Sequence, residues 1–201
     1  HSDSITCCKF SRDRKKIVSG SNDRSVRIWD TKRATELLVI EGHEAAITAC
    51  CFSPDGQQVL SASEDSTLRV WNAETGELAY VLSGHEGIVS DCSFSPDGGR
   101  IISCCDDRTL KIWDTRSGTM ITTLKGHTGF VKVCAFSPDG ARIASGSYDN
   151  TLRVWDGNAG CEIANCHHVP DGGHLTFSRS DERRRALRWP VPVERALRVR
   201  H

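Results

Sequence analysis

Residues 126–156 read GHTGFVKVCAFSPDGARIASGSYDNTLRVWD, and this stretch decides the fold because it recurs along the chain. The last three copies begin with Gly-His and the first with His1, and every copy closes on a tryptophan followed by Asp or Asn. The Gly-His pairs and the tryptophans stand at Gly42-His43, Gly84-His85, Gly126-His127, Trp29, Trp71, Trp113 and Trp155. Both series advance by 42 residues, and His1 lies one further step before His43. The chain therefore contains four copies of one unit over residues 1–166.

A fixed period of this length, with these opening and closing residues, is typical of a propeller blade. On these motifs the chain resembles the WD40-repeat family. The resemblance implies an all-β fold, a WD40 β-propeller with four recognisable blades at residues 1–41, 42–83, 84–125 and 126–166. Since WD40 propellers usually close with seven or eight blades, four blades are expected to form a partial, open arc. A compact four-bladed ring is the alternative.

The first residue, His1, lies inside a repeat, so the chain is expected to be a piece of a longer one. The missing blades would then lie upstream in that parent chain or come from another copy. An open arc leaves apolar blade faces exposed, and exposed faces of this kind favour pairing.

Each repeat predicts four short strands, which in the second copy span residues 47–52, 58–62, 67–71 and 78–82. Runs rich in β-branched and apolar residues, separated by Ser-Pro-Asp-Gly and Asp-containing turns, indicate antiparallel hairpins. In the first repeat Ser-Arg-Asp-Arg at 11–14 replaces Ser-Pro-Asp-Gly, so a looser turn is expected there.

After Cys166 the period fails, and residues 167–201 hold 8 Arg and no Lys. This composition predicts a degenerate, Arg-rich, disordered tail, either a functional basic arm or an out-of-frame or alternative sequence. A charge run with a single Trp is a weak signal, so a nucleic-acid ligand is disfavoured.

The whole chain has 201 residues, 38% of them hydrophobic, and a formal net charge of zero, which suits one globular domain. No apolar run approaches the ~20 residues that a membrane span needs, and no secretory leader is visible. An intracellular protein of the cytoplasm or nucleus is expected.

The ten cysteines include one at the same site of each repeat, and these four are Cys8, Cys50, Cys92 and Cys134. Equivalent sites of successive blades should lie too far apart for a disulfide. The cysteines are therefore interpreted as core residues of the strands in a protein from a reducing compartment. The cluster formed by Cys161, Cys166, His167 and His168 lacks a second spaced pair, so no metal site and no cofactor are predicted.

Four residue types, His, Ser, Asp and Trp, keep one internal spacing in every repeat. The four sets, here called tetrads, are His1/Ser19/Asp23/Trp29, His43/Ser61/Asp65/Trp71, His85/Ser103/Asp107/Trp113 and His127/Ser145/Asp149/Trp155. A hydrolase triad would need one such site, whereas here every repeat has one. The resemblance implies a structural network in which Asp accepts from His, His links to Ser, and Ser links to the indole N–H.

In WD40 proteins the loops that enter the first strand and the turns between the second and third strands line one rim, the usual partner-binding face. The resemblance places there Ser4, Thr6, Asn22, Ala46, Thr48, Glu64, Ile88, Ser90, Asp106, Phe130, Lys132 and Tyr148. Phe130 and Tyr148 could anchor an extended peptide, and Glu64 and Asp106 suggest a basic one. The alternative is that the two rings only pack loop on loop.

The main functional prediction is a non-catalytic scaffold that binds proteins or peptides. A second hypothesis is a substrate receptor of a cullin-4-type ubiquitin ligase, because Trp113-Asp114-Thr115-Arg116 resembles the adaptor-binding box of that family, with Asp114 and Arg116 as contacts. A third is a sensor or regulatory segment of a larger effector protein. An enzyme is disfavoured because no nucleophile elbow, phosphate loop or HExxH motif is present.

Overall fold

The computed structural model describes residues 1–167 and 176–179 of the chain. In this part of the chain the regular structure consists of β-strands, arranged in four sheets that follow the four sequence repeats. These sheets are called blades 1 to 4. The finding confirms the all-β fold with four propeller blades.

Each blade orders its strands as they occur in the chain, and every neighbouring pair is antiparallel. Blade 1 contains β1 (Ile5–Phe10), β2 (Lys16–Ser21), β3 (Val26–Asp30) and β4 (Thr35–Ile40). Blade 2 contains β5 (Ile47–Phe52), β6 (Gln58–Ser63), β7 (Leu68–Asn72) and β8 (Leu78–Leu82). Blade 3 contains β9 (Val89–Phe94), β10 (Arg100–Cys105), β11 (Thr109–Asp114) and β12 (Met120–Lys125). Blade 4 contains β13 (Val131–Phe136), β14 (Arg142–Ser147), β15 (Thr151–Asp156), β16 (Glu162–His167) and β17 (Thr176–Arg179).

The turn between the first two strands of blade 1 is as tight as its counterparts, contrary to the expectation of a looser turn. The Arg14 amide donates to the Ser11 carbonyl over 2.8 Å, and the corresponding bond from Gly56 to Ser53 in blade 2 is 2.9 Å. Arg14 adopts φ 61°, where Gly56 has φ 74°. The turn therefore keeps its hydrogen bonds at the expense of a left-handed backbone at a residue with a Cβ.

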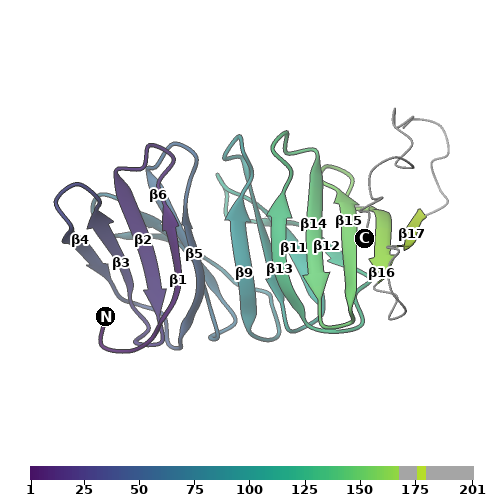
Figure 1. Cartoon of the computed structure of the whole chain (residues 1–201), viewed down its shortest axis with the longest axis horizontal. Coiled ribbons are helices and arrows are strands. Elements are labelled where there is room, and N and C mark those ends of the chain that lie inside the picture. The colour runs from purple at the N-terminus through teal and green to yellow at the C-terminus, as the bar shows by residue number, and fades with distance from the viewer. Residues whose placement is uncertain (168–175, 180–201) are drawn as a thin grey trace, which may run out of the picture.

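The four blades form an open arc. The first strands of successive blades contact one another, β1 with β5, β5 with β9 and β9 with β13. Figure 1 shows the sheets side by side in chain order, with blade 1 and blade 4 at opposite ends. The described part of the chain is thus a partial propeller, and the alternative of a compact four-bladed ring is wrong.

The core lies at the three junctions between blades. At the junction of blades 3 and 4, Leu110 shares one buried cluster with Val131 and Trp155, and the three are at most 1% exposed. Similar clusters fill the other two junctions. Stability in such an array comes mainly from contacts between neighbours.

The two outermost blade faces remain exposed because no further blade among the described residues packs on them. Phe10 of blade 1 is 63% exposed, whereas its equivalent in blade 2, Phe52, is 9% exposed. On the other end Leu152 of blade 4 is 47% exposed, whereas the equivalent Leu110 of blade 3 is fully buried. Both ends of the arc therefore expose apolar side chains whose equivalents in the inner blades are buried.

Strand β17 lies within the range 167–201 that the sequence analysis assigned to a disordered tail. It pairs antiparallel with β16, so residues 176–179 are an exception to that prediction. Pairing satisfies backbone groups along the outer edge of blade 4, which would otherwise be open. Residues 168–175 and 180–201, with the rest of the predicted arm, lie outside the described residues. The described residues contain no helix of the length and apolarity needed to span a bilayer.

Candidate functional site

The tetrads are joined by hydrogen bonds in all four blades. In blade 2 the Trp71 indole N–H donates to Ser61 Oγ over 2.8 Å, and His43 Nε2 lies 2.8 Å from the same oxygen. His43 Nδ1 lies 2.7 Å from Asp65 Oδ2. The other three sets repeat these contacts. A chain of donors running from Trp through Ser and His to Asp gives every polar group a partner.

The Asp of each tetrad also holds the backbone. Asp65 Oδ2 accepts from the Glu44 amide over 3.0 Å, and Asp65 Oδ1 accepts from the Thr67 amide over 2.9 Å. The carboxylate thus ties the loop before β5 to the turn between β6 and β7. Each tetrad fixes one corner of a blade, and the side chains carried on that corner become preorganised.

The electrostatics of the network favour neutral His and ionised Asp. Burial raises the pKa of Asp65, but hydrogen bonds from Thr67 and His43 outweigh it and hold the pKa at about 2. Burial also lowers the pKa of His43 below its usual range, against the pull of the Asp65 hydrogen bond. The pKa values of Asp107 and Asp149 are lowered by the same kinds of bonds.

The serines of the tetrads are poorly placed for nucleophilic attack. Ser61 and Ser103 are fully buried, and Ser19 and Ser145 are at most 4% exposed. Each hydroxyl oxygen already accepts an indole N–H. A substrate could not reach these oxygens without opening the blade, so the tetrads support a structural role.

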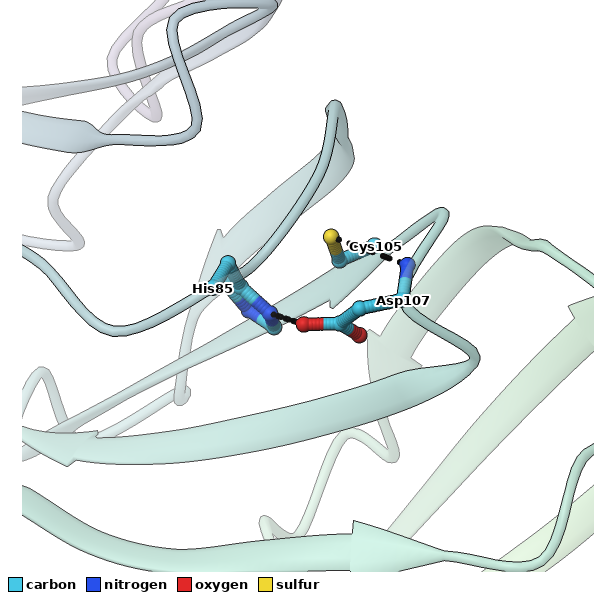
Figure 2. A group of neighbouring side chains, drawn as sticks. All are labelled: His85, Cys105 and Asp107. Carbon is cyan, nitrogen blue, oxygen red and sulfur yellow. Dashed lines mark hydrogen bonds and ion pairs between the residues drawn. The ribbon is translucent and has the colours of Figure 1, made fainter.

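Blade 3 departs from the others at one residue of this corner. Among the described residues, His85, Cys105 and Asp107 bring three potential metal-binding atoms within 4.8 Å of one another (Figure 2). The Asp107 amide donates to Cys105 Sγ over 3.2 Å, as the Asp65 amide does to Ser63 Oγ in blade 2. Burial raises the pKa of Cys105 to about 12, so its thiol is protonated at neutral pH. The group is therefore explained as a tetrad corner in which Cys105 takes the place that Ser63 has in blade 2. The tetrad serine of blade 3, Ser103, is retained.

The Gly-His loops and the turns after the second strands form one rim of the arc, called the His rim. In each blade a backbone hydrogen bond joins two residues predicted to lie there. The bonds run from the amides of Asn22, Glu64, Asp106 and Tyr148 to the carbonyls of Ser4, Ala46, Ile88 and Phe130, over 2.9–3.0 Å. The structure thus places these eight residues in adjacent pairs around one edge.

The third rim residue predicted for each blade makes different contacts from blade to blade. These residues are Thr6, Thr48, Ser90 and Lys132. The hydroxyls of Thr6 and Thr48 donate to backbone carbonyls of the following blade, at Ile47 and Val89. These two side chains connect blades and are not free for a ligand. Ser90 Oγ donates instead to Asp106 Oδ1 within blade 3.

The corner between blades 3 and 4 carries the aromatic pair. Phe130 and Tyr148 are 44% and 70% exposed, and their ring centroids are 6.4 Å apart. Lys132 Nζ lies 5.4 Å and 5.1 Å from the two centroids, within cation–π range. The same ammonium group forms an ion pair with Asp106 Oδ1 at 2.5 Å. These four residues are called the aromatic corner.

This ion pair changes the predicted charge of the surface. The sequence predicts Glu64 and Asp106 as two carboxylates that flank an aromatic pocket. In the structure Asp106 is already paired with Lys132, whereas Glu64 is exposed. The contact connects residues 26 positions apart on different blades, so no spacing within a repeat could have indicated it.

The residues of the Trp-Asp-Thr-Arg box lie on the opposite rim, called the Pro rim, at the turn after β11. Asp114 Oδ1 accepts from the Ser117 amide over 2.8 Å and from the Ser117 hydroxyl over 2.9 Å. Hydrogen bonds from Ser117 lower the pKa of Asp114. Arg116 is exposed. Asp114 is thus occupied within its own turn, and Arg116 is available at the surface.

A hollow with a volume of about 460 Å³ on the Pro rim was not predicted from the sequence. Its walls include Phe52, Pro54, Phe94, Pro96, Phe136 and Pro138. The sequence signal for this hollow is the recurring Phe-Ser-Pro-Asp-Gly, which had indicated only turns.

The group of Cys161, Cys166, His167 and His168 near the end of blade 4, from which no metal site was predicted, is only partly described. Cys161 is exposed and Cys166 is buried, so the two thiols occupy different environments. The His167 side chain and all of His168 lie outside the described residues.

Comparison with protein-family models finds matches to the model described as "WD domain, G-beta repeat". They cover residues 1–30, 34–72, 76–114 and 118–156. Each match after the first begins near the fourth strand of one blade and continues through the first three strands of the next. A search of curated proteins finds no match to this chain.

Proposed function

Since the chain belongs to the WD40-repeat family, we propose that it is a non-catalytic scaffold that binds other proteins through the aromatic corner of its His rim. WD40 repeats generally mediate protein–protein interaction.

The observation that supports this surface most strongly is the exposure of two large rings on rigid turns. Phe130 and Tyr148 are 44% and 70% exposed. Aromatic side chains dominate interface energies because they bury a large area with few rotatable bonds. The equivalent positions of blade 2 carry Ala46 and Glu64, so the rings distinguish this corner from its neighbour.

The corner is held in one arrangement before any ligand binds. The Tyr148 amide donates to the Phe130 carbonyl over 2.9 Å, and Lys132 spans both rings while bound to Asp106. His127 and Asp149 anchor the adjoining loop and turn through a 2.8 Å hydrogen bond. A preformed surface loses less conformational entropy on binding than a flexible one.

The chemistry of the corner favours an extended peptide with one aromatic or aliphatic anchor. The rings supply apolar area, and the Lys132–Asp106 pair adds little net charge. Glu64, on the next blade, is exposed and forms no ion pair with any described residue, so a basic ligand residue would be placed toward it. The proposed ligand is therefore a peptide with an apolar anchor followed or preceded by Arg or Lys.

A peptide-display selection tests this proposal. A random dodecapeptide phage library is selected on immobilised wild-type chain and counter-selected on the Phe130→Ala/Tyr148→Ala variant. The proposal expects enriched peptides with an aromatic or large aliphatic residue and a basic one, binding the double variant at least tenfold more weakly. Leu78→Ala, at an exposed residue of blade 2, is the control and should bind as the wild type does. Equal affinity for wild type and double variant would exclude the aromatic corner.

The ubiquitin-ligase alternative has one supporting observation, the exposure of Arg116 on the Pro rim. Under this alternative the chain would bind the ligase adaptor through Arg116. Binding of purified adaptor to wild type but not to Arg116→Ala would support it. An absence of binding by the wild-type chain would exclude it for this chain.

The exposed end faces suggest a second kind of partner, namely further blades. The face that blade 4 leaves open carries Leu152, and the face that blade 1 leaves open carries Phe10, so together they correspond to the two sides of an inner junction. We propose that another copy can supply the missing neighbour.

Light scattering after size-exclusion chromatography tests this, using Phe10→Glu and Leu152→Glu, each of which blocks one face. Each variant alone should be monomeric, whereas a mixture should form a dimer through the two intact faces. Self-association of the wild type that neither substitution reduces, or a wild type that stays monomeric, would contradict the second-copy partner.

A further inference from the structure

Every junction between blades contains a pair of cysteines, one from each blade. The pairs are Cys7 with Cys50, Cys51 with Cys92, and Cys104 with Cys134. They arise because cysteines at non-equivalent positions of two repeats meet across the junction. Equivalent cysteines of successive blades were expected to lie too far apart for a disulfide, whereas these pairs are not equivalent and share one junction.

The pair at the junction of blades 1 and 2 is the most favourable for bond formation. Cys7 Sγ lies 3.3 Å from Cys50 Sγ. Strands β1 and β5 are held together here because Thr6 Oγ1 donates to the Ile47 carbonyl. A disulfide requires about 2.05 Å between the sulfurs, so they would have to approach by roughly 1.3 Å. Cys7 is half-buried and Cys50 is 2% exposed, so an oxidant of small size reaches Cys7 first.

The surroundings of Cys7 favour its thiolate. The hydrogen bond between the Cys7 and Cys50 sulfurs lowers the pKa of Cys7, burial opposes this, and bonds with Thr6 and Gly20 lower it further. The pKa values of Cys50 and Cys92 are instead raised, with the side-chain hydrogen bonds to Cys7 and Cys51 as the largest cause, and burial raises that of Cys134. Because the thiolate is the reactive form of cysteine, Cys7 is the nucleophile of the pair.

We propose that Cys7 and Cys50 form a site of reversible oxidation that joins blade 1 to blade 2 covalently. In the first step the Cys7 thiolate attacks one oxygen of hydrogen peroxide, giving a Cys7 sulfenic acid and hydroxide. In the second step the Cys50 sulfur attacks Cys7 Sγ, the S–O bond breaks, and the Cys50 proton leaves with the hydroxyl as water. Overall two thiols and one hydrogen peroxide give one disulfide and two water molecules.

The Cys7–Cys50 disulfide would stabilise the attachment of blade 1, which lies at the end of the arc. Blade 1 packs on a neighbour through one face only, since Ile5 and Phe10 on its other face are 59% and 63% exposed. A link from Cys7 to Cys50 closes a loop that contains all of β2, β3 and β4. Opening of blade 1 away from blade 2 would then require reduction of the disulfide.

The experiment uses the full 201-residue chain treated with equimolar hydrogen peroxide and then mapped by mass spectrometry without reduction. Cys8 and Cys51 are the sequence neighbours of Cys7 and Cys50 and fall in the same peptides. The mapping is therefore repeated in a Cys8→Ser/Cys51→Ser variant, in which a cross-link between these peptides has only one assignment. The expected result is a Cys7–Cys50 link, loss of two reactive thiols, and recovery of both with dithiothreitol. Slower amide hydrogen exchange in β2 and β3 of the oxidised chain is also expected.

Two single variants provide the controls. Cys7→Ser should lose no thiols from this junction, and Cys161→Ser, at an exposed cysteine of blade 4, should oxidise as the wild type does. If Cys7→Ser misfolds, the wild-type and Cys8→Ser/Cys51→Ser peptide maps still decide the matter. A Cys7 that is converted to sulfinic acid while Cys50 stays reduced, or a link that excludes Cys7, would overturn the proposal.

Discussion

Lys132 Nζ lies 2.5 Å from Asp106 Oδ1, an ion pair that connects blade 4 to blade 3 at the His rim. The Lys132 side chain is 29% exposed and that of Asp106 is 16% exposed, so solvent screens the pair only in part. The pair also positions the ammonium group against Phe130 and Tyr148. One contact between two blades thus contributes both to their junction and to the proposed binding surface.

A double-mutant cycle with Lys132→Met and Asp106→Asn measures this ion pair. We expect a coupling of about 1 kcal/mol in the free energy of unfolding, because the pair is partly shielded from water. Denaturant unfolding at low and high salt provides the measurement, and the coupling should shrink at high salt. A coupling near zero at low salt would show that the contact does not stabilise the junction.

The tetrads predict a specific loss of stability when a serine is removed. Ser61→Ala leaves the Trp71 indole N–H and one nitrogen of His43 without a partner inside a buried site. We expect a loss of about 1–3 kcal/mol in the free energy of unfolding. Ser83→Ala, at an exposed serine between blades, is the matched control and should change little. Similar stabilities for the two variants would contradict the assigned network.

The pKa shifts predict that stability falls on acidification in two stages. The pKa values of His43 and His127 are lowered by burial, so the folded state favours neutral His, and this contribution is lost as pH falls below about 6.5. Asp23 and Asp65 have pKa values of about 2, so their contribution is present above about pH 4 and is lost between pH 4 and 2. Guanidinium unfolding across this range checks both stages. In Asp65→Asn the decline below pH 4 should be smaller, and an unchanged profile would argue against the ionised Asp65.

The first turn of blade 1 predicts a stabilising substitution. Arg14 has φ 61° where three other blades place glycine at φ 69–74°. Arg14→Gly should raise the free energy of unfolding by up to about 1 kcal/mol, because it relieves a left-handed conformation at a residue with a Cβ. Arg12→Gly, two residues earlier in the same exposed turn, controls for the loss of a positive charge. If both substitutions have the same effect, backbone strain at Arg14 is not the cause.

The features that repeat within one blade were predictable from the sequence. A 42-residue period identified the blades, and the resemblance to the WD40-repeat family implied that His43, Ser61, Asp65 and Trp71 would be joined by hydrogen bonds. These contacts lie inside one sheet, where strand register determines which residues face each other.

The features that arise between blades were not predictable in the same way. The Lys132–Asp106 ion pair and the Cys7–Cys50 contact join non-equivalent positions of different repeats. Their formation depends on how one blade packs on the next, and a spacing counted within the repeat carries no information about that geometry. Strand β17 pairs with the edge of β16 after the periodic signal has ended, so the 42-residue period gave no indication of this pairing.

Hydrogen–deuterium exchange of the chain with and without a selected dodecapeptide tests the central claim most directly, because it locates the bound ligand. The account predicts slower exchange around Phe130–Lys132 and at the turn that carries Tyr148, with little change at the turns on the Pro rim. Protection confined to the Pro rim near Pro54, Pro96 and Pro138 would contradict the assignment of the aromatic corner as the binding surface.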